Sequence, residues 1–236
     1  MQETSELYQQ LLCTPGHYKE IALEVAGELY LEDRISFLST YSKLFSGDQP
    51  KTGCAVAREL RATLRNPGTI SETARLVPMF RLRYADMASE WIRKGIYYIY
   101  TRSVNTKGNT VSIFAFDAML HADQVWVPRQ SLTFPMSMRA AVEEMAQLMS
   151  VDPDCPIELD NPDDISVARV VDYPANDWTC RNILQFIAAA HGGNFVVTDL
   201  GKLRLCRLGD CPPETFDLVD SYGRAIVVGG VRIRVG

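Results

Sequence analysis

The sequence predicts an α+β fold: a mainly antiparallel, barrel-like β domain that carries a small inserted α/β domain of two helices and a β-hairpin. Polar and apolar residues alternate with the two-residue period of strands between residues 75 and 116. Beyond residue 130 the period becomes that of amphipathic helices, and a hairpin pattern follows. We expect the barrel-like domain over 1–130, the insert over 131–210, and a linker with the first strands of a second or returning β domain over 211–236.

Composition and charge limit the classes of function. The 236 residues allow one large domain or two small ones, at roughly 100–200 residues per domain. A hydrophobic content of 47% is typical of a globular chain with a real core. The net charge of −5 argues against a nucleic-acid binder held by phosphate contacts, because such a protein needs a basic face. It leaves open that DNA passes nearby without being held.

Before residue 75 the sequence predicts strands, loops and one segment whose type stays open. Residues 17–31 alternate with a two-residue period, and residues 35–45 have the composition of a further irregular strand. The polar stretches 46–53 and 66–71 predict loops. For residues 54–65 helix and strand both stay open, and the content of Ala, Arg, Glu and Leu favours the helix.

The strongest β signal is a meander of three strands joined by short polar turns. These strands are expected at about residues 79–84, 89–102 and 111–120. The middle strand carries an aromatic group that is a candidate subunit-interface or packing surface, formed by Trp91, Tyr97, Tyr98 and Tyr100. A ligand-binding aromatic box or a carbohydrate platform is the alternative for this group.

The aromatic strand should be apolar on both faces. Tyr98 and Tyr100 are expected to share one face, since side chains alternate along a strand. Tyr97 and Ile99 are expected on the other. Gly95 should mark a bulge or the strand entry. A strand with two apolar faces is typically buried on both, so we expect one face to fill the barrel and the other to meet a neighbour, staying partly exposed in a lone chain.

The insert is predicted from two helices and a hairpin. Residues 137–149 repeat apolar side chains at helical spacing after the N-cap candidate Ser137. Residues 178–193 also repeat apolar side chains at helical spacing, with Thr179 as the N-cap, and end in two glycines. A hairpin is expected over 194–208.

The last residues read as two further β segments about Gly229 and Gly230, after a loop over 209–223. An unpaired apolar strand at a terminus is a liability. Either these strands pair back to the first β region, or the chain is cut from a longer protein, and we expect both.

The sequence has the features of a protein made in a reducing compartment. Residues 1–16 lack the charged and apolar regions of a signal peptide. No run of about 18 apolar residues is present, so no membrane association is expected. The cysteines are scattered without a CxxC motif and are expected to be free thiols. They are Cys13, Cys54, Cys155, Cys180, Cys206 and Cys211.

Metal-binding patterns are weak. His17 follows Cys13 by four residues, a spacing that zinc could use, but no second ligand pair accompanies it. His191 is expected to lie at a helix C-terminus, where the helix dipole favours an imidazole. The acidic run Asp160, Asp163 and Asp164 could offer oxygen ligands to Ca²⁺, but lacks the EF-hand spacing and is read as a solvated loop.

Catalytic patterns are weaker still. Glu143 and Glu144 are adjacent on a helix and diverge by about 100°, so they are read as a solvated face. HGGNF (191–195) has no GxSxG partner, and Cys54 and Cys180 have no histidine in a recognisable motif. Neither a P-loop, a GxGxxG nor an HExxH occurs. We predict no enzyme, no cofactor and no metal. A cytoplasmic enzyme would need an activity that depends on His17, His121 or His191.

Three stretches together carry a family resemblance. EWIRKGIYYIYTR (90–102), followed by VSIFAFDAMLHADQVW (111–126), resembles the N-terminal part of tail-tip or baseplate hub proteins encoded by phages and prophages. WTCRNILQFIAAAHGGNFVVTDLGKLRL (178–205) resembles a later helix-plus-hairpin segment of the same family. The resemblance covers residues 17–208 and rests on structural motifs, so no catalytic residue is carried over.

The resemblance implies a structural role. It implies a trimer whose related β-barrel domains form a ring with pseudo-sixfold symmetry, joining the tail tube to a spike or fibre and letting DNA pass without specific binding. The expected partners are further copies of the chain and other tail proteins, namely the distal tail or tube protein and the spike or fibre. The expected location is the virion tail, after synthesis in the cytoplasm of the bacterial host. The alternative is a cell-wall-binding or peptidoglycan-hydrolase-associated module of a tail lysin, since longer relatives of the family carry a peptidoglycan-cleaving domain.

Overall fold

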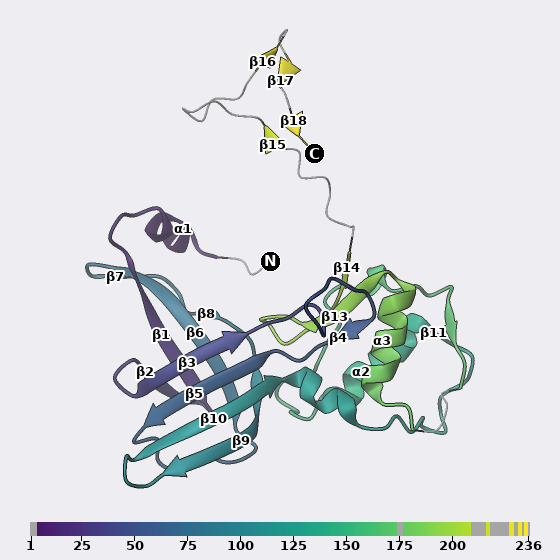
Figure 1. The fold of residues 1–236 in the computed structure, drawn as a ribbon, viewed down its shortest axis with the longest axis horizontal. Helices are drawn as coiled ribbons and strands as arrows, with labels where there is room; N and C mark the ends of the chain where they lie inside the picture. The colour runs from purple at the N-terminus through teal and green to yellow at the C-terminus, as the bar shows by residue number, and fades with distance from the viewer. Residues whose placement is uncertain are drawn as a thin grey trace. The chain divides into compact units, whose positions relative to one another are not determined.

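The computed structural model describes residues 4–173 and 177–208, and beyond them the backbone of four short strands. The chain divides into two compact units, Met1–Cys206 and Arg207–Gly236. The first unit combines a large antiparallel sheet with helices, which confirms the predicted α+β class (Figure 1). The predicted domain limits at 130 and 210 stay predictions.

The antiparallel sheet has nine strands. Seven of them follow the order β2-β1-β6-β9-β10-β5-β3, and the other two, β7 and β8, each pair with β6. The strands are β1 (Tyr18–Val25), β2 (Glu28–Leu31), β3 (Ile35–Tyr41), β5 (Glu59–Arg65), β6 (Arg75–Tyr84), β7 (Met87–Ala88), β8 (Ile92–Arg93), β9 (Tyr97–Asn105) and β10 (Thr110–Asp117). The neighbours β6, β9 and β10 form the predicted meander.

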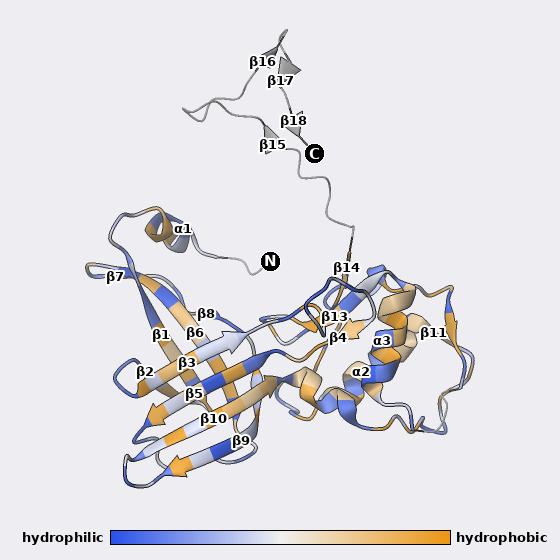
Figure 2. Cartoon of the chain, viewed as in Figure 1, coloured by the Kyte–Doolittle hydropathy of each residue, from blue (hydrophilic) through white to orange (hydrophobic). Residues whose placement is uncertain are grey.

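The sheet curves around one buried cluster. Tyr30 on β2 and Ile35 on β3 stand on opposite edge strands, yet both pack into this cluster with Leu60 and Leu76. Curvature is what brings the two edges of one sheet to a common core. No strand pair in the described residues joins β2 to β3, so the barrel-like sheet is open along that edge. Figure 2 shows the mixture of apolar and polar residues along these strands.

Of the two alternatives for residues 54–65, the strand is correct and the helix that the composition favoured is not. The segment forms the short strand β4 (Cys54–Ala55) and then β5, which pairs with β10 on one side and β3 on the other. Leu60, Ala62 and Leu64 of β5 are buried while the residues between them are not, which is the period of a strand. Pairing with strands far away in the sequence therefore outweighs the helical propensity of Ala, Leu and Arg.

The single strand predicted over 89–102 is two strands. β8 and β9 are separated at Gly95, whose φ of +119° ends the first before the second begins. A Cβ atom at Gly95 would lie 2.6 Å from Cε2 of Tyr97, so the ring occupies the space that a side chain would need. The third strand ends at Asp117, where a 3₁₀ helix, η1 (Ala118–Asp123), replaces its predicted last residues.

The α/β part packs two helices against a small sheet. Its elements are β11 (Met136–Ser137), α2 (Met138–Met149), η2 (Pro162–Asp164), β12 (Val170–Val171), α3 (Cys180–Ala190), β13 (Gly193–Val197) and β14 (Leu203–Arg207). The hairpin β13–β14 is extended by β4, which pairs in parallel with β13. Both predicted N-caps are confirmed: Ser137 accepts a hydrogen bond from Ala140 N, and Thr179 accepts one from Asn182 N. A short helix, α1 (Glu6–Leu12), precedes the first sheet and buries Leu11.

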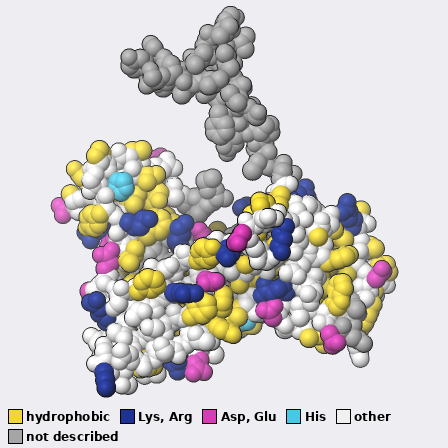
Figure 3. Space-filling view, in the orientation of Figure 1, with side chains coloured by type: hydrophobic (Ala, Val, Ile, Leu, Met, Phe, Trp, Pro, Cys, Tyr) yellow, Lys and Arg dark blue, Asp and Glu magenta, His cyan; other side chains and the backbone are white. Residues whose placement is uncertain are grey.

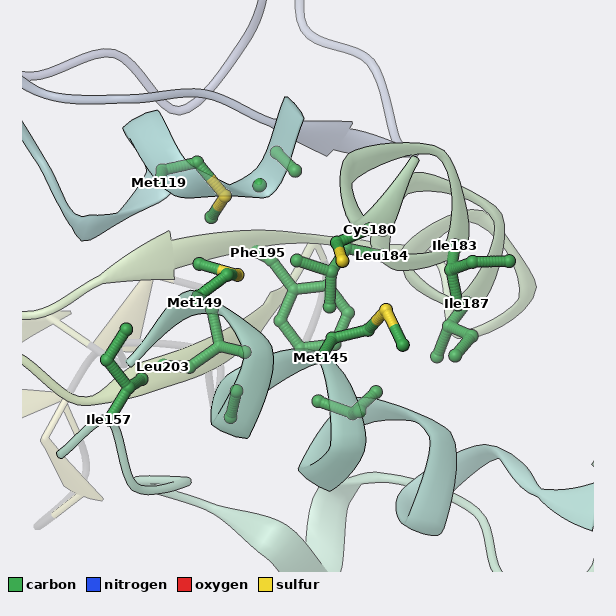
Figure 4. Packing of buried hydrophobic residues seen from close by; sticks show 14 of the residues in the cluster. Met119, Met145, Met149, Ile157, Cys180, Ile183, Leu184, Ile187, Phe195 and Leu203 are labelled. Carbon is green, nitrogen blue, oxygen red and sulfur yellow. The ribbon is translucent and has the colours of Figure 1, made fainter. Parts of the chain in front are cut away.

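A second buried cluster fills the α/β part (Figure 4). Phe195 of β13 lies among the side chains of α2, α3 and η1, including Met119, Met145 and Met149, and all four are fully buried. Methionine adapts to irregular gaps, which suits a core where a 3₁₀ helix, two α-helices and a three-stranded sheet converge.

The second unit contains β15 (Phe216–Asp217), β16 (Val227–Val228), β17 (Val231–Arg232) and β18 (Arg234–Val235). β16 pairs with β17, and β15 with β18, both antiparallel. The two β segments predicted about Gly229 and Gly230 are therefore present, while the glycines themselves and most of the predicted loop lie outside the described residues.

Candidate functional site

The outer face of the curved sheet carries an exposed aromatic cluster. Tyr100 is 60% exposed and packs edge-on against Phe114 at 6.2 Å and Phe116 at 5.5 Å between ring centroids. The two phenylalanines are 4.7 Å apart. Their neighbours Ala115 and Ile113 point the other way, into the buried cluster of the sheet. We call Tyr100, Phe114 and Phe116 the aromatic cluster.

A β-bulge places Tyr100 in this cluster. Ala115 pairs with Ile99, and Phe114 pairs with Thr101, so Tyr100 is the extra residue between them. A bulge re-aims side chains and shifts the alternation that follows by one residue. Thr101 and Ser103 consequently join the outer face beyond Tyr100, in register with Phe114 and Ser112.

A groove of about 530 Å³ runs beside the cluster across β3, β5, β10 and β9. Its lining includes Phe37, Arg61, Thr63, Ser112 and Phe114. The Arg61 guanidinium lies over the Phe114 ring at 5.0 Å, and the Thr63 and Ser112 hydroxyls are 3.2 Å apart. Aromatic rings and arginine are the side chains that most often carry binding energy at protein interfaces. The surface offers contacts to another protein rather than a set of reacting groups.

The four predicted aromatic residues lie in four different environments. Tyr97 is fully buried in the core of the sheet, on the same side as Ile99. Tyr98 lies on the other face, where the α/β part covers it, and burial raises the pKa of each of the two tyrosines to about 12. Tyr100 is exposed in the aromatic cluster, and Trp91 stacks under Arg81 at 4.4 Å. The facing of the tyrosines is as the alternation predicts, and their role as a subunit interface stays a prediction.

A second hollow, of about 430 Å³, lies where Tyr98 meets the α/β part. His121 contacts Tyr98 here at 5.0 Å between ring centroids. Its Nε2 atom is buried without a hydrogen bond to a described residue, and burial lowers the pKa of the imidazole. The carboxylates that line the hollow, Glu72 and Asp152, each form an ion pair with an arginine outside the hollow.

The other histidines have structural roles. His191 ends α3, as predicted: its Nε2 accepts a hydrogen bond from Ser166 N at 2.9 Å, and its Nδ1 lies 2.8 Å from Ile187 O. The Nδ1 atom of His17 lies 2.7 Å from Thr14 O. Among the described residues, no group of three or more histidines, cysteines or acidic residues is placed to hold a metal ion.

The acidic candidates form ion pairs. Glu144 is only 4% exposed and pairs with Arg129, so its predicted place on the solvated face of the helix is wrong. Its neighbour Glu143 is exposed. In the acidic loop, Asp160 pairs with Arg204 at 2.7 Å and Asp163 pairs with an arginine of α2. The Glu144 pair could not be predicted from the sequence, because Arg129 comes from a loop before the helix.

The cysteines and helices add two observations. The cysteines at 13, 54, 155, 180 and 206 are free thiols, and burial raises the pKa of Cys180 to about 11. Cys211 lies outside the described residues. Within the part of the chain that the structure describes, no helix is both long enough and apolar enough to span a bilayer.

The fold and its surface define a class: a curved antiparallel sheet with an attached α/β part and a partly exposed aromatic cluster on the outer face of the sheet. No family model and no curated protein matches the chain. Among solved structures, the chain is similar to the 43 kDa tail protein of prophage MuSo2 from Shewanella oneidensis, with a TM-score of 0.52 and 14% identity. That likeness covers 81% of this chain and 56% of the tail protein, so the chain spans a little over half of that relative's length.

Two further solved structures give weaker matches. A tail protein from Neisseria meningitidis MC58 matches with a TM-score of 0.48 and 12% identity, covering 85% of this chain and 54% of the other. The prophage tail protein gp18 from Listeria monocytogenes EGD-e matches with a TM-score of 0.40 and 9% identity, covering 92% of this chain and 67% of gp18. At the 14% identity of the MuSo2 protein, the likeness concerns the fold alone.

Proposed function

We propose that the chain is a structural component of a phage or prophage tail, acting in the tail tip or baseplate hub. The observation that carries this proposal is the fold shared with the MuSo2 tail protein over 81% of the chain. In this role the protein forms a ring that joins the tail tube to the spike or fibre and lets DNA pass. It acts in the virion tail after synthesis in the host cytoplasm. No catalytic role, cofactor or metal is part of the proposal.

The aromatic cluster and its groove are the proposed contact with a second copy of the chain, in a trimer. Tyr100 is exposed and Phe114 and Phe116 are half-buried beside it, so the three rings form a partly exposed apolar patch, and such patches mark interaction sites. The outer edges of β2 and β3 pair with no other strand in the described part of the chain, so they leave further backbone groups for pairing between copies.

The charge pattern supports passage of DNA without binding. The chain has a net charge of −5. On the face seen in Figure 3, lysines and arginines are interspersed with acidic and hydrophobic side chains and form no continuous basic stripe. A surface without such a stripe releases few counterions on meeting DNA and so does not hold it.

Sedimentation velocity tests the trimer and its contact. The wild-type chain, alone and extended past Gly236, is expected to sediment as a trimer at micromolar concentration. Tyr100→Glu should yield monomers, since a carboxylate buried between copies would lie against apolar rings. Tyr18→Glu is the matched control, because Tyr18 is an exposed tyrosine on β1 of the same sheet, and should leave the trimer unchanged. A monomeric extended chain that also fails to bind tail-tube protein would refute the proposal.

The alternative to the structural role is a glycan-binding module, which a separate binding experiment tests. It requires an exposed aromatic platform, and Tyr98 is almost completely covered while Trp91 is half-buried beneath Arg81. Binding to a peptidoglycan fragment that disappears in Trp91→Ala or Tyr98→Ala would favour this alternative over the structural role.

A further inference from the structure

The chain passes twice between the large sheet and the α/β part, and the two crossings lie side by side. One crossing leads from β4 to β5 through Arg58, and the other leads from β10 into η1 at Asp117. The Asp117 N–H donates to the Arg58 carbonyl at 3.1 Å, so the backbones of the two crossings are directly bonded.

Two arginines hold the crossings from either side. The Arg58 guanidinium donates to Val197 O and to Lys94 O at 3.4 Å each, and forms an ion pair with Asp199 at 2.7 Å. From α3, the Arg181 guanidinium donates to Ala55 O and to Met119 O, and pairs with Asp123 of η1 at 2.5 Å. Each guanidinium is thus engaged with carbonyls of the crossings or of the strands beside them.

The Asp117 carboxyl is buried within electrostatic reach of both arginines, and one of its two oxygens is without a hydrogen-bond partner among the described residues. It is 1% exposed. Its Oδ1 accepts a hydrogen bond from Met119 N at 3.0 Å and so caps η1, while Oδ2 has no hydrogen-bond partner among the described residues. Tyr97 faces the same region from β9, and its hydroxyl donates to Lys94 O at 3.1 Å rather than to the carboxyl.

We propose that Asp117 is a proton-dependent latch, which holds the two crossings together as a neutral acid and loosens them when its proton is lost to water. A neutral carboxyl can stay buried with one oxygen unbonded at modest cost, whereas an ionised one needs donors to both oxygens. The nearby donors are the Arg58 and Arg181 guanidinium groups. To reach Oδ2, the terminal nitrogens would have to leave the carbonyls of Val197, Lys94, Ala55 or Met119. Otherwise the buried Arg58 Nε, which has no partner among the described residues, would have to turn towards Oδ2, or water would have to enter.

The direction of the pH effect follows from linkage. Burial raises the pKa of Asp117 from its usual 3.8 to about 7 in the closed protein. If the two crossings separate, the Asp117 carboxyl regains its usual pKa. Between pH 3.8 and about 7, the separated state therefore binds fewer protons than the closed state. Closure is therefore favoured most at low pH, is lost progressively as the pH rises towards 7, and levels off above it.

Hydrogen exchange measured by mass spectrometry between pH 4.5 and 8.5 tests the latch in the full chain. After correction for intrinsic exchange, peptides covering 55–59 and 117–123 should lose protection by up to about tenfold per pH unit below pH 7. Asp117→Asn should flatten this dependence, because the amide keeps the cap oxygen but carries no proton that titrates. Asp163→Asn, which alters an exposed carboxylate, should behave as wild type.

Two results would overturn the proposal. The first is that protection of these two peptides depends on pH in the same way in the wild type and in Asp117→Asn. The other comes from NMR of the wild-type chain labelled at aspartate carboxyl carbons, which also decides the matter if the variant does not fold. The Asp117 signal should titrate with a midpoint near 7, and a midpoint near 4 contradicts the latch.

Discussion

At the scale of single residues, Gly95 and Tyr97 together fix how the aromatic strand begins. Gly95 adopts a φ of +119°, which side chains rarely allow, and the Tyr97 ring fills the space next to it. The Tyr97 hydroxyl then donates to the carbonyl of Lys94, on the other side of the glycine. The ring therefore closes over the backbone turn that separates β8 from β9.

Gly95→Ala should destabilise the protein more than an ordinary glycine substitution does. The backbone strain costs about 1–3 kcal/mol, and displacing the fully buried Tyr97 ring adds a packing cost of about 1–3 kcal/mol. Urea unfolding followed by fluorescence measures the sum. The control is Gly27→Ala, where φ is +88° but nothing lies within 4 Å of the new Cβ, so only the strain applies. Equal losses in the two variants would show that the Tyr97 ring does not matter.

Side-chain facing along β9 could be predicted, and buried polar partners could not. Alternation alone places Tyr97 towards the core and Tyr98 on the other face. The bulge at Tyr100 leaves no mark in the sequence, since it arises from how β9 and β10 pair. The unbonded oxygen of Asp117 and the Glu144–Arg129 pair depend in the same way on contacts between distant segments.

At the scale of elements, the helices follow from local signals. Thr179 and Asn182 form a reciprocal capping box at the start of α3, in which each side chain bonds the backbone N–H of the other. Caps and a helical period are encoded within a few residues, which is why α2 and α3 could be located from the sequence. The strand β5 could not be located from the sequence, because it is a strand only through its pairing with β3 and β10.

Removing the cap of α3 should weaken the α/β part. Thr179→Ala leaves Asn182 N–H without its acceptor and should lower the free energy of unfolding by about 1 kcal/mol. Thr179→Ser keeps the hydroxyl and should change stability by much less. Thermal unfolding followed by circular dichroism distinguishes the two. If both variants lose the same stability, the Thr179 methyl group and not the cap is responsible.

At the scale of the whole molecule, the two parts of the first unit are joined by long-range pairing. β4 leaves the neighbourhood of the large sheet to pair in parallel with β13, about 140 residues later, and Cys54 N donates to the Asn194 side chain at 2.7 Å. The general α+β class could be predicted from the order of strand and helix patterns. The parallel pairing of β4 with β13 could not be predicted, since the two residues of β4 are too few to show the alternation of a strand.

The first unit should fold and assemble without the second. All described residues of its two buried clusters lie before residue 206, and in the part of the chain that the structure describes, β15 to β18 pair only with each other. Ending the chain after Leu208 should therefore shift the unfolding temperature by no more than about 3 °C, the change expected for roughly 1 kcal/mol in a chain of this size. Because the aromatic cluster is retained, the shortened chain should also sediment as the wild type does, and Tyr100→Glu should still dissociate it. A shortened chain that folds but stays monomeric would place the contact between copies in residues 209–236 and not on the outer face of the sheet.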